Sequence, residues 1–191
     1  TEIYTLSLHD ALPICWLCSP GVQLRQGVLE AMADAIRHRG PDDHGYYREP
    51  DTGLALAHRR LSIIDLSDAS HQPMVDEARQ VALAYNGELY NFRELRRELQ
   101  GRGHAFRSSG DTEVVLKCYI EWGAAAFERF NGMFALAVWD GISHTLHLAR
   151  DAMGIKPLYY LQQTKRLAFE SEVKAFMMLD DFRAELNDRS L

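Results

Sequence analysis

VALAYNGE, residues 81–88, has the pattern of a strand that ends in a polar site. Apolar side chains alternate from Val81 to Tyr85, as in a strand with one buried face. Asn86 and Gly87 follow, and an amide beside a glycine can present a side-chain donor and a backbone N–H to one developing oxyanion. Asn-Gly is also a common hairpin turn, but helical spacing after Asn91 replaces the returning strand that a hairpin needs. We therefore predict an oxyanion-binding pair at Asn86 and Gly87.

Two opposite charges flank this stretch at a distance. Arg60 begins RLSII (60–64), and Asp111 lies within SGDTE (109–113). Arg60 precedes largely apolar residues, so we expect it to point inward and to need a carboxylate, whereas we interpret Arg59 as a surface residue. Asp111 also suits a helix N-cap, and both roles can hold at once. A cation and an anion beside an amide-binding pair match the carboxylate, ammonium and amide of glutamine.

Composition narrows the class of protein. The 191 residues are 47% hydrophobic and 25% charged, with a formal net charge of -6, which is ordinary for a globular domain. Acidic and basic residues are interleaved, so we expect no nucleic-acid or anionic-membrane partner. Three cysteines are too few for a disulfide framework, and no signal peptide or membrane span is indicated. We therefore expect a cytoplasmic protein.

Hydrophobic periodicity predicts one domain in which helices and strands form separate runs. Such segregation favours an α+β fold over a parallel α/β sheet. Helices are expected at 24–38, after Asn91, from Asp111 and at 172–178, and strands at 54–66, 80–85, 133–139, 145–149, 158–161 and 167–169.

Five ordered motifs resemble the class II glutamine amidotransferases, and more narrowly the glutaminase domain of glutamine-hydrolysing asparagine synthetase. They are HRGPD (38–42), HRRLSIID (58–65), NGELYN (86–91), SGDTE (109–113) and RDAMGIKPLYY (150–160). RLSII after the substrate arginine, with GIKP (154–157) and SEVK (171–174), favours the asparagine-synthetase branch. Five motifs in order are far more specific than any one of them.

The resemblance implies a four-layer αββα sandwich of the N-terminal-nucleophile hydrolase type, in which a terminal cysteine attacks the glutamine amide and its own α-amine serves as the base. It also implies roles for particular residues. Arg60 would bind the α-carboxylate in a slot lined by Leu61, Ser62, Ile63 and Ile64; Asp111, helped by Glu88, would bind the α-ammonium; Asn86 and Gly87 would form the oxyanion hole.

The N-terminus departs from the family pattern, which begins Met-Cys-Gly-Ile. We interpret residues 1–15 as a foreign or mis-assembled segment, such as a translated sequencing adapter or a wrong start, and residues 16–191 as the glutaminase domain. Cys15 would be a nucleophile only if cleavage made its amine terminal, and an inert cysteine is the favoured interpretation. Cys15 and Cys18 lack the second pair that a zinc site needs. We therefore expect the fragment to be inactive as written.

The resemblance also implies partners. Glutamine hydrolysis needs no metal or other cofactor, whereas ATP and magnesium would belong to an ATP-dependent synthetase domain that this sequence lacks and that would amidate aspartate. A homodimer is left open. Two alternatives remain: a non-catalytic glutamine-binding or interaction module, and the glutaminase domain of another class II amidotransferase.

Overall fold

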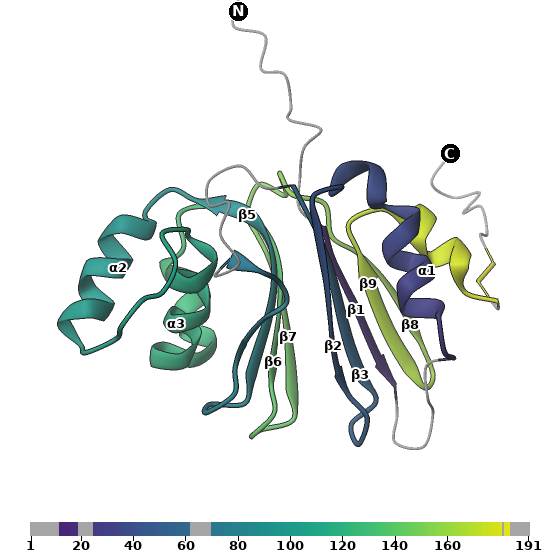
Figure 1. Ribbon diagram of the computed structural model, residues 1–191, viewed down its shortest axis with the longest axis horizontal. Helices are drawn as coiled ribbons and strands as arrows, with labels where there is room; N and C mark the ends of the chain where they lie inside the picture. The colour runs from purple at the N-terminus through teal and green to yellow at the C-terminus, as the bar shows by residue number, and fades with distance from the viewer. Residues whose placement is uncertain (1–11, 19–24, 62–69, 181, 184–191) are drawn as a thin grey trace, which may run out of the picture.

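Two antiparallel sheets pack face to face in the computed structural model, which describes residues 12–18, 25–61, 70–180 and 182–183 (Figure 1). The first sheet has five strands in the order β2-β3-β1-β9-β8. Its strands are β1 (Leu12–Cys18), β2 (Asp43–Glu49), β3 (Leu54–Arg60), β8 (Tyr159–Gln163) and β9 (Arg166–Glu170).

The second sheet has four strands in the order β4-β5-β6-β7. They are β4 (Met74–Asp76), β5 (Val81–Leu89), β6 (Gly132–Asp140) and β7 (Thr145–Arg150). Its central pair, β5 and β6, stays in register from Val81 opposite Asp140 to Leu89 opposite Gly132. The VALAYNGE stretch therefore belongs to one long strand, and Asn86 and Gly87 lie inside that strand instead of in a turn.

Helices cover the outer face of each sheet (Figure 1). The first sheet is covered by α1 (Val28–Ala35), which η1 (Arg37–Arg39) follows, and by the 3-10 helix η4 (Val173–Met178). The second sheet is covered by α2 (Phe92–Gly101), α3 (Thr112–Trp122) and the 3-10 helix η3 (Gly123–Arg129). This arrangement confirms the predicted αββα layering. No helix in the described ranges is long and apolar enough to span a bilayer.

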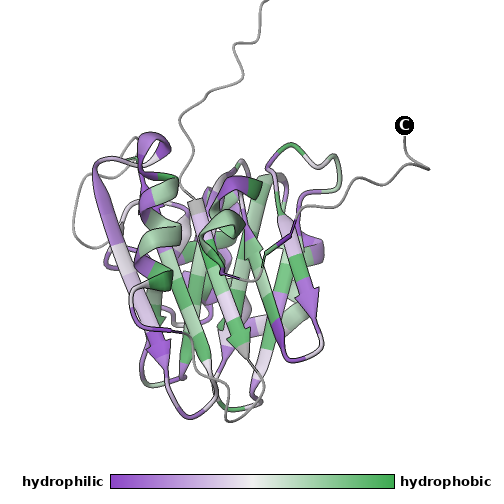
Figure 2. Ribbon diagram, turned by 90° about the vertical axis from the view of Figure 1, so that its right-hand side faces the viewer, coloured by the Kyte–Doolittle hydropathy of each residue, from purple (hydrophilic) through white to green (hydrophobic). Residues whose placement is uncertain are grey.

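Alternation along the strands divides the core into three parts. On β3, Ala55 and Ala57 face α1, whereas Leu54 and Leu56 face the other sheet. On β5, Leu83 and the other odd-numbered residues face α2 and α3. Figure 2 shows hydrophobic residues along the central strands and hydrophilic residues mainly at the turns. Even-numbered positions of β3 and β5 therefore share the space between the sheets.

The strand β1 begins inside the segment that we interpreted as foreign. Leu12 pairs with Arg59 of β3, and Ile14 pairs with both Ala57 and Glu170. Residues 12–15 thus complete the middle of the first sheet, whatever their origin. The predicted domain boundary at residue 16 stays a prediction.

Several predicted elements differ from the structure. The predicted helix at 172–178 is wrong in type, because six residues give fewer than two α-turns and form the 3-10 helix η4 instead. The predicted helix at 24–38 shortens to α1 and then tightens into η1. The strand β2 was missed because DHGYYRE is polar, as suits an edge strand that must not aggregate.

Candidate active site

Those predicted site residues that the structure describes lie on or next to elements that meet at one end of the sandwich, where β1 begins and β3 and β5 end, here called the site end (Figure 1). The register places the start of β1 beside the last residues of β3, since Leu12 lies opposite Arg59. A side chain of β3 reaches β5 here: His58 Nε2 lies 3.0 Å from the carbonyl oxygen of Tyr85. The two sheets are therefore tied together next to Asn86.

Asn86 presents a buried donor without a partner. Its side chain is 1% exposed, and the Nδ2 atom has no hydrogen-bond partner among the residues that the structure describes. As an even-numbered residue of β5, it faces the space between the sheets. A buried amide donor left unsatisfied is costly, and such a cost is tolerated where a ligand supplies the acceptor. This geometry fits the predicted oxyanion role.

Gly87 is required by close packing of β5 against β6. A Cβ atom at this position would lie 2.7 Å from Cβ of Phe134, which no ordinary contact allows. A side chain would therefore push β5 away from β6 and displace Asn86. Glycine also leaves the backbone open to close approach by a ligand.

Asp111 lies directly before α3, and its carboxylate turns toward β5. The hydroxyl of Tyr85 and the backbone N–H of Leu89 both donate to Oδ2 of Asp111, each over 2.8 Å. Asp111 occupies the predicted N-cap position of α3, but its side chain makes no capping hydrogen bond to that helix. Burial raises the pKa of Asp111, although the bonds from Leu89 and Tyr85 act in the opposite direction. The structure therefore brings Asp111 to the same strand that carries Asn86.

Arg60 is the last residue of β3 and is buried. It is opposite Asp43 on β2. The preceding arginine is also buried: Arg59 faces the other way, donates from Nε to the carbonyl oxygen of Ala33 and pairs with Asp34, so its predicted surface position is wrong. The alternation of a strand places neighbouring residues on opposite faces, and each arginine has its own partners.

The remaining predicted residues are only partly visible. Leu61 is half-buried just after β3, whereas Ser62, Ile63 and Ile64 lie outside the described residues. The side chain of Glu88 is exposed, next to Leu89, which bonds Asp111. Their predicted roles stay predictions.

Three residues were missed by the sequence analysis, namely Tyr85, His58 and Gln72. Gln72 is buried, accepts the N–H of Tyr85 over 2.7 Å and donates to its carbonyl oxygen over 3.0 Å. Burial lowers the pKa of His58 to about 4, so its ring is neutral near neutral pH and donates one N–H to Tyr85. The only signals in the sequence were a histidine and a tyrosine inside otherwise apolar strands.

The thiols that the structure describes are poor nucleophiles. Cys15 is fully buried between the sheets, and burial raises its pKa well above the ordinary range. Burial also raises the pKa of Cys118, on the buried face of α3, to about 12. Thiolate is the reactive form, so neither residue suits the role. Within the described ranges, no three His, Cys, Asp or Glu side chains cluster to hold a metal ion.

Comparison with known families identifies what this arrangement is similar to. A family model described as a glutamine amidotransferase domain matches residues 15–191. Asparagine synthetase [glutamine-hydrolyzing] 3 of Bacillus subtilis is 38% identical over 172 residues, which cover 89% of this chain and 27% of the relative. A putative asparagine synthetase [glutamine-hydrolyzing] 2 of Methanocaldococcus jannaschii is 33% identical over 183 residues, covering 87% and 35%. The chain therefore spans about a quarter to a third of these relatives.

A solved structure shares the fold. Glutamine phosphoribosylpyrophosphate amidotransferase from B. subtilis, complexed with ADP and GMP, superposes with a TM-score of 0.71 at 19% identity. The match covers 88% of this chain and 43% of that chain. At this identity the likeness concerns the fold alone.

Proposed function

This chain belongs to the glutamine amidotransferase domain family, and on that premise we propose that it binds L-glutamine and hydrolyses the side-chain amide to glutamate and ammonia. The observation that carries the proposal is the buried side-chain amide of Asn86, whose Nδ2 has no hydrogen-bond partner among the described residues. Asn86 lies beside Gly87 on β5, and the same strand donates the N–H of Leu89 to Asp111. The family that the five motifs suggested is confirmed, whereas the reaction is our proposal.

The proposed residues have complementary roles. Arg60, with the slot formed by Leu61 and residues 62–64, binds the α-carboxylate, and Asp111 binds the α-ammonium with help from Glu88. The amide oxygen then lies against Asn86 Nδ2 and the Gly87 N–H, which stabilise negative charge as it develops. One such donor contributes about 3 kcal/mol to transition-state stabilisation in measured cases.

The nucleophile in this proposal is a cysteine at the start of the mature chain, next to the beginning of β1. Its α-amine takes the thiol proton, and the resulting thiolate attacks the amide carbon. The protonated amine then gives this proton to the leaving nitrogen, so the C–N bond breaks, ammonia departs and a thioester remains. Water then attacks the thioester, so glutamate and the free thiol are released. Cys15 does not fill this role, because its thiol is buried between the sheets and protonated.

The names of the relatives supply the acceptor of this proposal. Both relatives are glutamine-hydrolysing asparagine synthetases, the second of them putative. We propose that the ammonia amidates aspartate in an ATP- and magnesium-dependent synthetase domain, and that the glutaminase domain itself needs no cofactor. A cytoplasmic location and a homodimer are compatible with this proposal.

A second candidate function is glutamine binding without hydrolysis. The burial of both described thiols, Cys15 and Cys118, favours it for the chain as written. The two candidates share the pocket and differ only in turnover. One set of measurements therefore separates them.

The test measures glutamine binding by calorimetry and glutamate release by a coupled assay. We expect the chain as written to bind glutamine without turnover, and a chain that starts with cysteine directly before Leu12 to release glutamate. Arg60→Met should weaken glutamine binding about a hundredfold, because it removes the partner of a buried carboxylate. Arg48→Met is the matched control, since Arg48 is exposed and pairs with Glu30.

Three results are decisive. The absence of glutamine binding would remove both candidate functions. Binding that survives in Arg60→Met would contradict the assigned carboxylate site. If the chain that starts with cysteine binds glutamine but releases no glutamate, glutamine binding without hydrolysis is the function.

A further inference from the structure

Tyr85 uses both its side chain and its backbone to join separate parts of the site. The side chain lies on the α3 face of β5 and is 2% exposed. Its hydroxyl donates to Oδ2 of Asp111 over 2.8 Å, and the N–H of Leu89 donates to the same oxygen over 2.8 Å. One strand therefore supplies two donors that fix a single carboxylate oxygen.

The backbone of Tyr85 is fixed from two other segments. The strand β4 pairs only with Val81, Ala82 and Leu83. Beyond it, the side chain of Gln72 takes the place of a strand, accepting the Tyr85 N–H and donating to the Tyr85 carbonyl. Nε2 of His58, from the other sheet, lies 3.0 Å from the same carbonyl. Both peptide groups that flank Tyr85 are thus held.

The residue after Tyr85 is Asn86. Successive side chains of a strand point to opposite faces, so Tyr85 reaches Asp111 while Asn86 faces the space between the sheets. Any rotation of this part of β5 would move the carboxylate and the amide together. Asp111 and Asn86, at the two ends of the proposed glutamine site, are therefore both positioned by the same segment of β5.

Resting on the proposed function, we propose that Tyr85 is a positioning residue for the α-ammonium of glutamine. Its hydroxyl holds the carboxylate of Asp111 in the orientation, and in the charged form, that the ammonium requires. Hydrogen bonds to a carboxylate favour its ionised state, which matters here because burial alone favours the neutral acid.

Charged and titratable groups on β5, α2 and α3 lie around the hydrogen bond between Tyr85 and Asp111. Glu88 and Tyr90 lie at the end of β5 and raise the pKa of Tyr85, after burial and Asp111 itself. On α3, the carboxylate of Glu113 accepts the N–H groups of Arg107 and Ser108 and the Ser108 hydroxyl.

From α2, Arg96 donates to the carbonyl oxygens of Ser108 and Gly110, just before Asp111. Glu113 and Arg96 are therefore engaged with the loop that precedes α3. The hydroxyl of Tyr85 is a side-chain donor to Asp111 that a single substitution can remove.

The experiment compares two ligands in Tyr85→Phe, which deletes only the hydroxyl. Glutamine and glutaramate, which is glutamine without its α-ammonium, are titrated by calorimetry at several pH values. We expect glutamine affinity to fall about tenfold near neutral pH, the size of one hydrogen bond to a charged group, and glutaramate affinity to stay unchanged. The acid limb of glutamine binding should move to higher pH, because Asp111 loses a bond that favours its charge.

Tyr119→Phe is the matched control. Tyr119 is also buried, and its hydroxyl donates to Oδ2 of Asp140 over 3.2 Å. Asp140 lies opposite Val81 at the start of β5, away from the site end. This variant removes the same kind of bond from outside the site, so neither ligand should bind differently. Thermal unfolding of both variants reports whether each still folds.

The outcomes separate the inference from the function on which it rests. If Tyr85→Phe folds and keeps wild-type glutamine affinity, or loses both ligands equally, Tyr85 has no specific role toward the ammonium. If the wild type binds neither ligand, the proposed function fails and the inference fails with it. A selective loss of glutamine with a shifted acid limb supports the assignment.

Discussion

Two buried carboxylates, one in each half of the sandwich, differ in what surrounds them. Asp111 is 7% exposed between α3 and β5 and receives two hydrogen bonds on one oxygen. Glu170 ends β9 in the other sheet and is 0% exposed. Neither oxygen of Glu170 has a hydrogen-bond partner among the described residues, and the adjacent Ser171 hydroxyl also lacks one.

Under the proposed function, hydrogen-bond donors, and not burial alone, decide whether a buried acid can bind a cationic ligand. Burial raises the pKa of both groups, and that of Glu170 well above its usual range, with a further contribution from Glu172. An acid that stays protonated cannot attract an ammonium ion. Only at Asp111 do Tyr85 and Leu89 supply bonds that favour the charged form.

The largest expected effect follows from removing the charge of Asp111. Asp111→Asn keeps an oxygen for the two donors but cannot pair with an ammonium, so glutamine affinity should fall by about a hundredfold or more. Stability near neutral pH should hold or increase, because a buried charge is removed. Calorimetry with glutamine and thermal unfolding measure the two effects. Unchanged binding in a folded variant would show that Asp111 does not contact the substrate.

Glu170→Gln should change stability and leave glutamine binding unchanged. Burial raises the pKa of Glu170 in the folded state above its value in the unfolded state. At pH values below the unfolded-state pKa, Glu170 is protonated in both states and its ionisation costs no stability. As pH rises from there toward the folded-state pKa, the cost to stability grows. The variant should therefore match the wild type near pH 4 and exceed its stability as pH rises, because an amide at this position never ionises.

Urea unfolding at a series of pH values measures this gain. Glu77→Gln is the control, since Glu77 is exposed in the turn before β5. A gain of equal size in the control would point to overall charge instead of burial. A loss of stability in Glu170→Gln would mean that the carboxylate is paired in solution.

Much of the architecture could be predicted because hydrophobic periodicity marks the elements that form the core. The strand β5 alternates clearly, and a helix was correctly expected from Asp111. The edge strand β2 was missed because its exposed residues carry no apolar pattern. Periodicity records burial, so it reports poorly on elements at the margin of a sheet.

The site could be predicted only as far as local motifs reach. Asn86, Gly87 and Asp111 stood out because each has an unusual neighbour in the sequence. Tyr85 did not stand out, since its hydrogen bond to Asp111 joins residues that are 26 positions apart in the sequence. The unpaired carboxylate of Glu170 could not be predicted either, because LAFE (167–170) is an ordinary strand sequence. Only the fold shows that its last residue has no hydrogen-bond donor within the described part of the chain.

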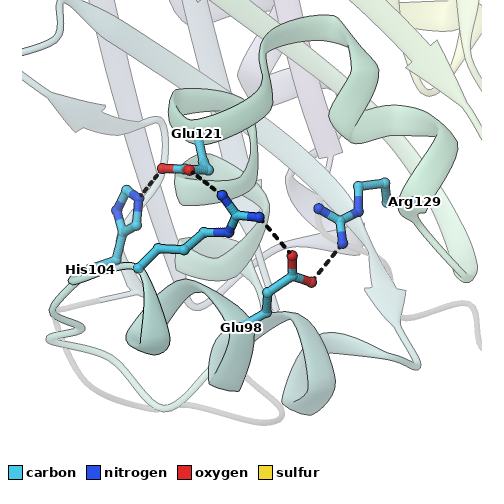
Figure 3. A network of polar contacts seen from close by, with 5 residues as sticks. Glu98, His104, Glu121 and Arg129 are labelled. Atoms are coloured by element: carbon cyan, nitrogen blue, oxygen red, sulfur yellow. Dashed lines mark hydrogen bonds and ion pairs between the residues drawn. The ribbon is translucent and has the colours of Figure 1, made fainter.

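The smallest effect is expected at the partly exposed carboxylates of the α2 and α3 layer (Figure 3). Glu98 pairs with Arg129 over 2.6 Å and with Arg102, whereas Glu121 pairs with Arg102 and His104. The bond from Arg129 lowers the pKa of Glu98, so this pairing stabilises the fold above the usual glutamate pKa and is lost as pH falls.

Glu98→Gln should therefore lower the unfolding temperature slightly near neutral pH, and the difference should shrink in acid and in high salt. Thermal scans at two salt concentrations check this. The same chemical change then has opposite signs at positions 98 and 170. Glu98 is partly exposed and has donors, whereas Glu170 is buried and has no hydrogen-bond partner among the described residues. A stabilising Glu98→Gln would break that rule, since it would mean that even a well-paired carboxylate on this surface is a net cost.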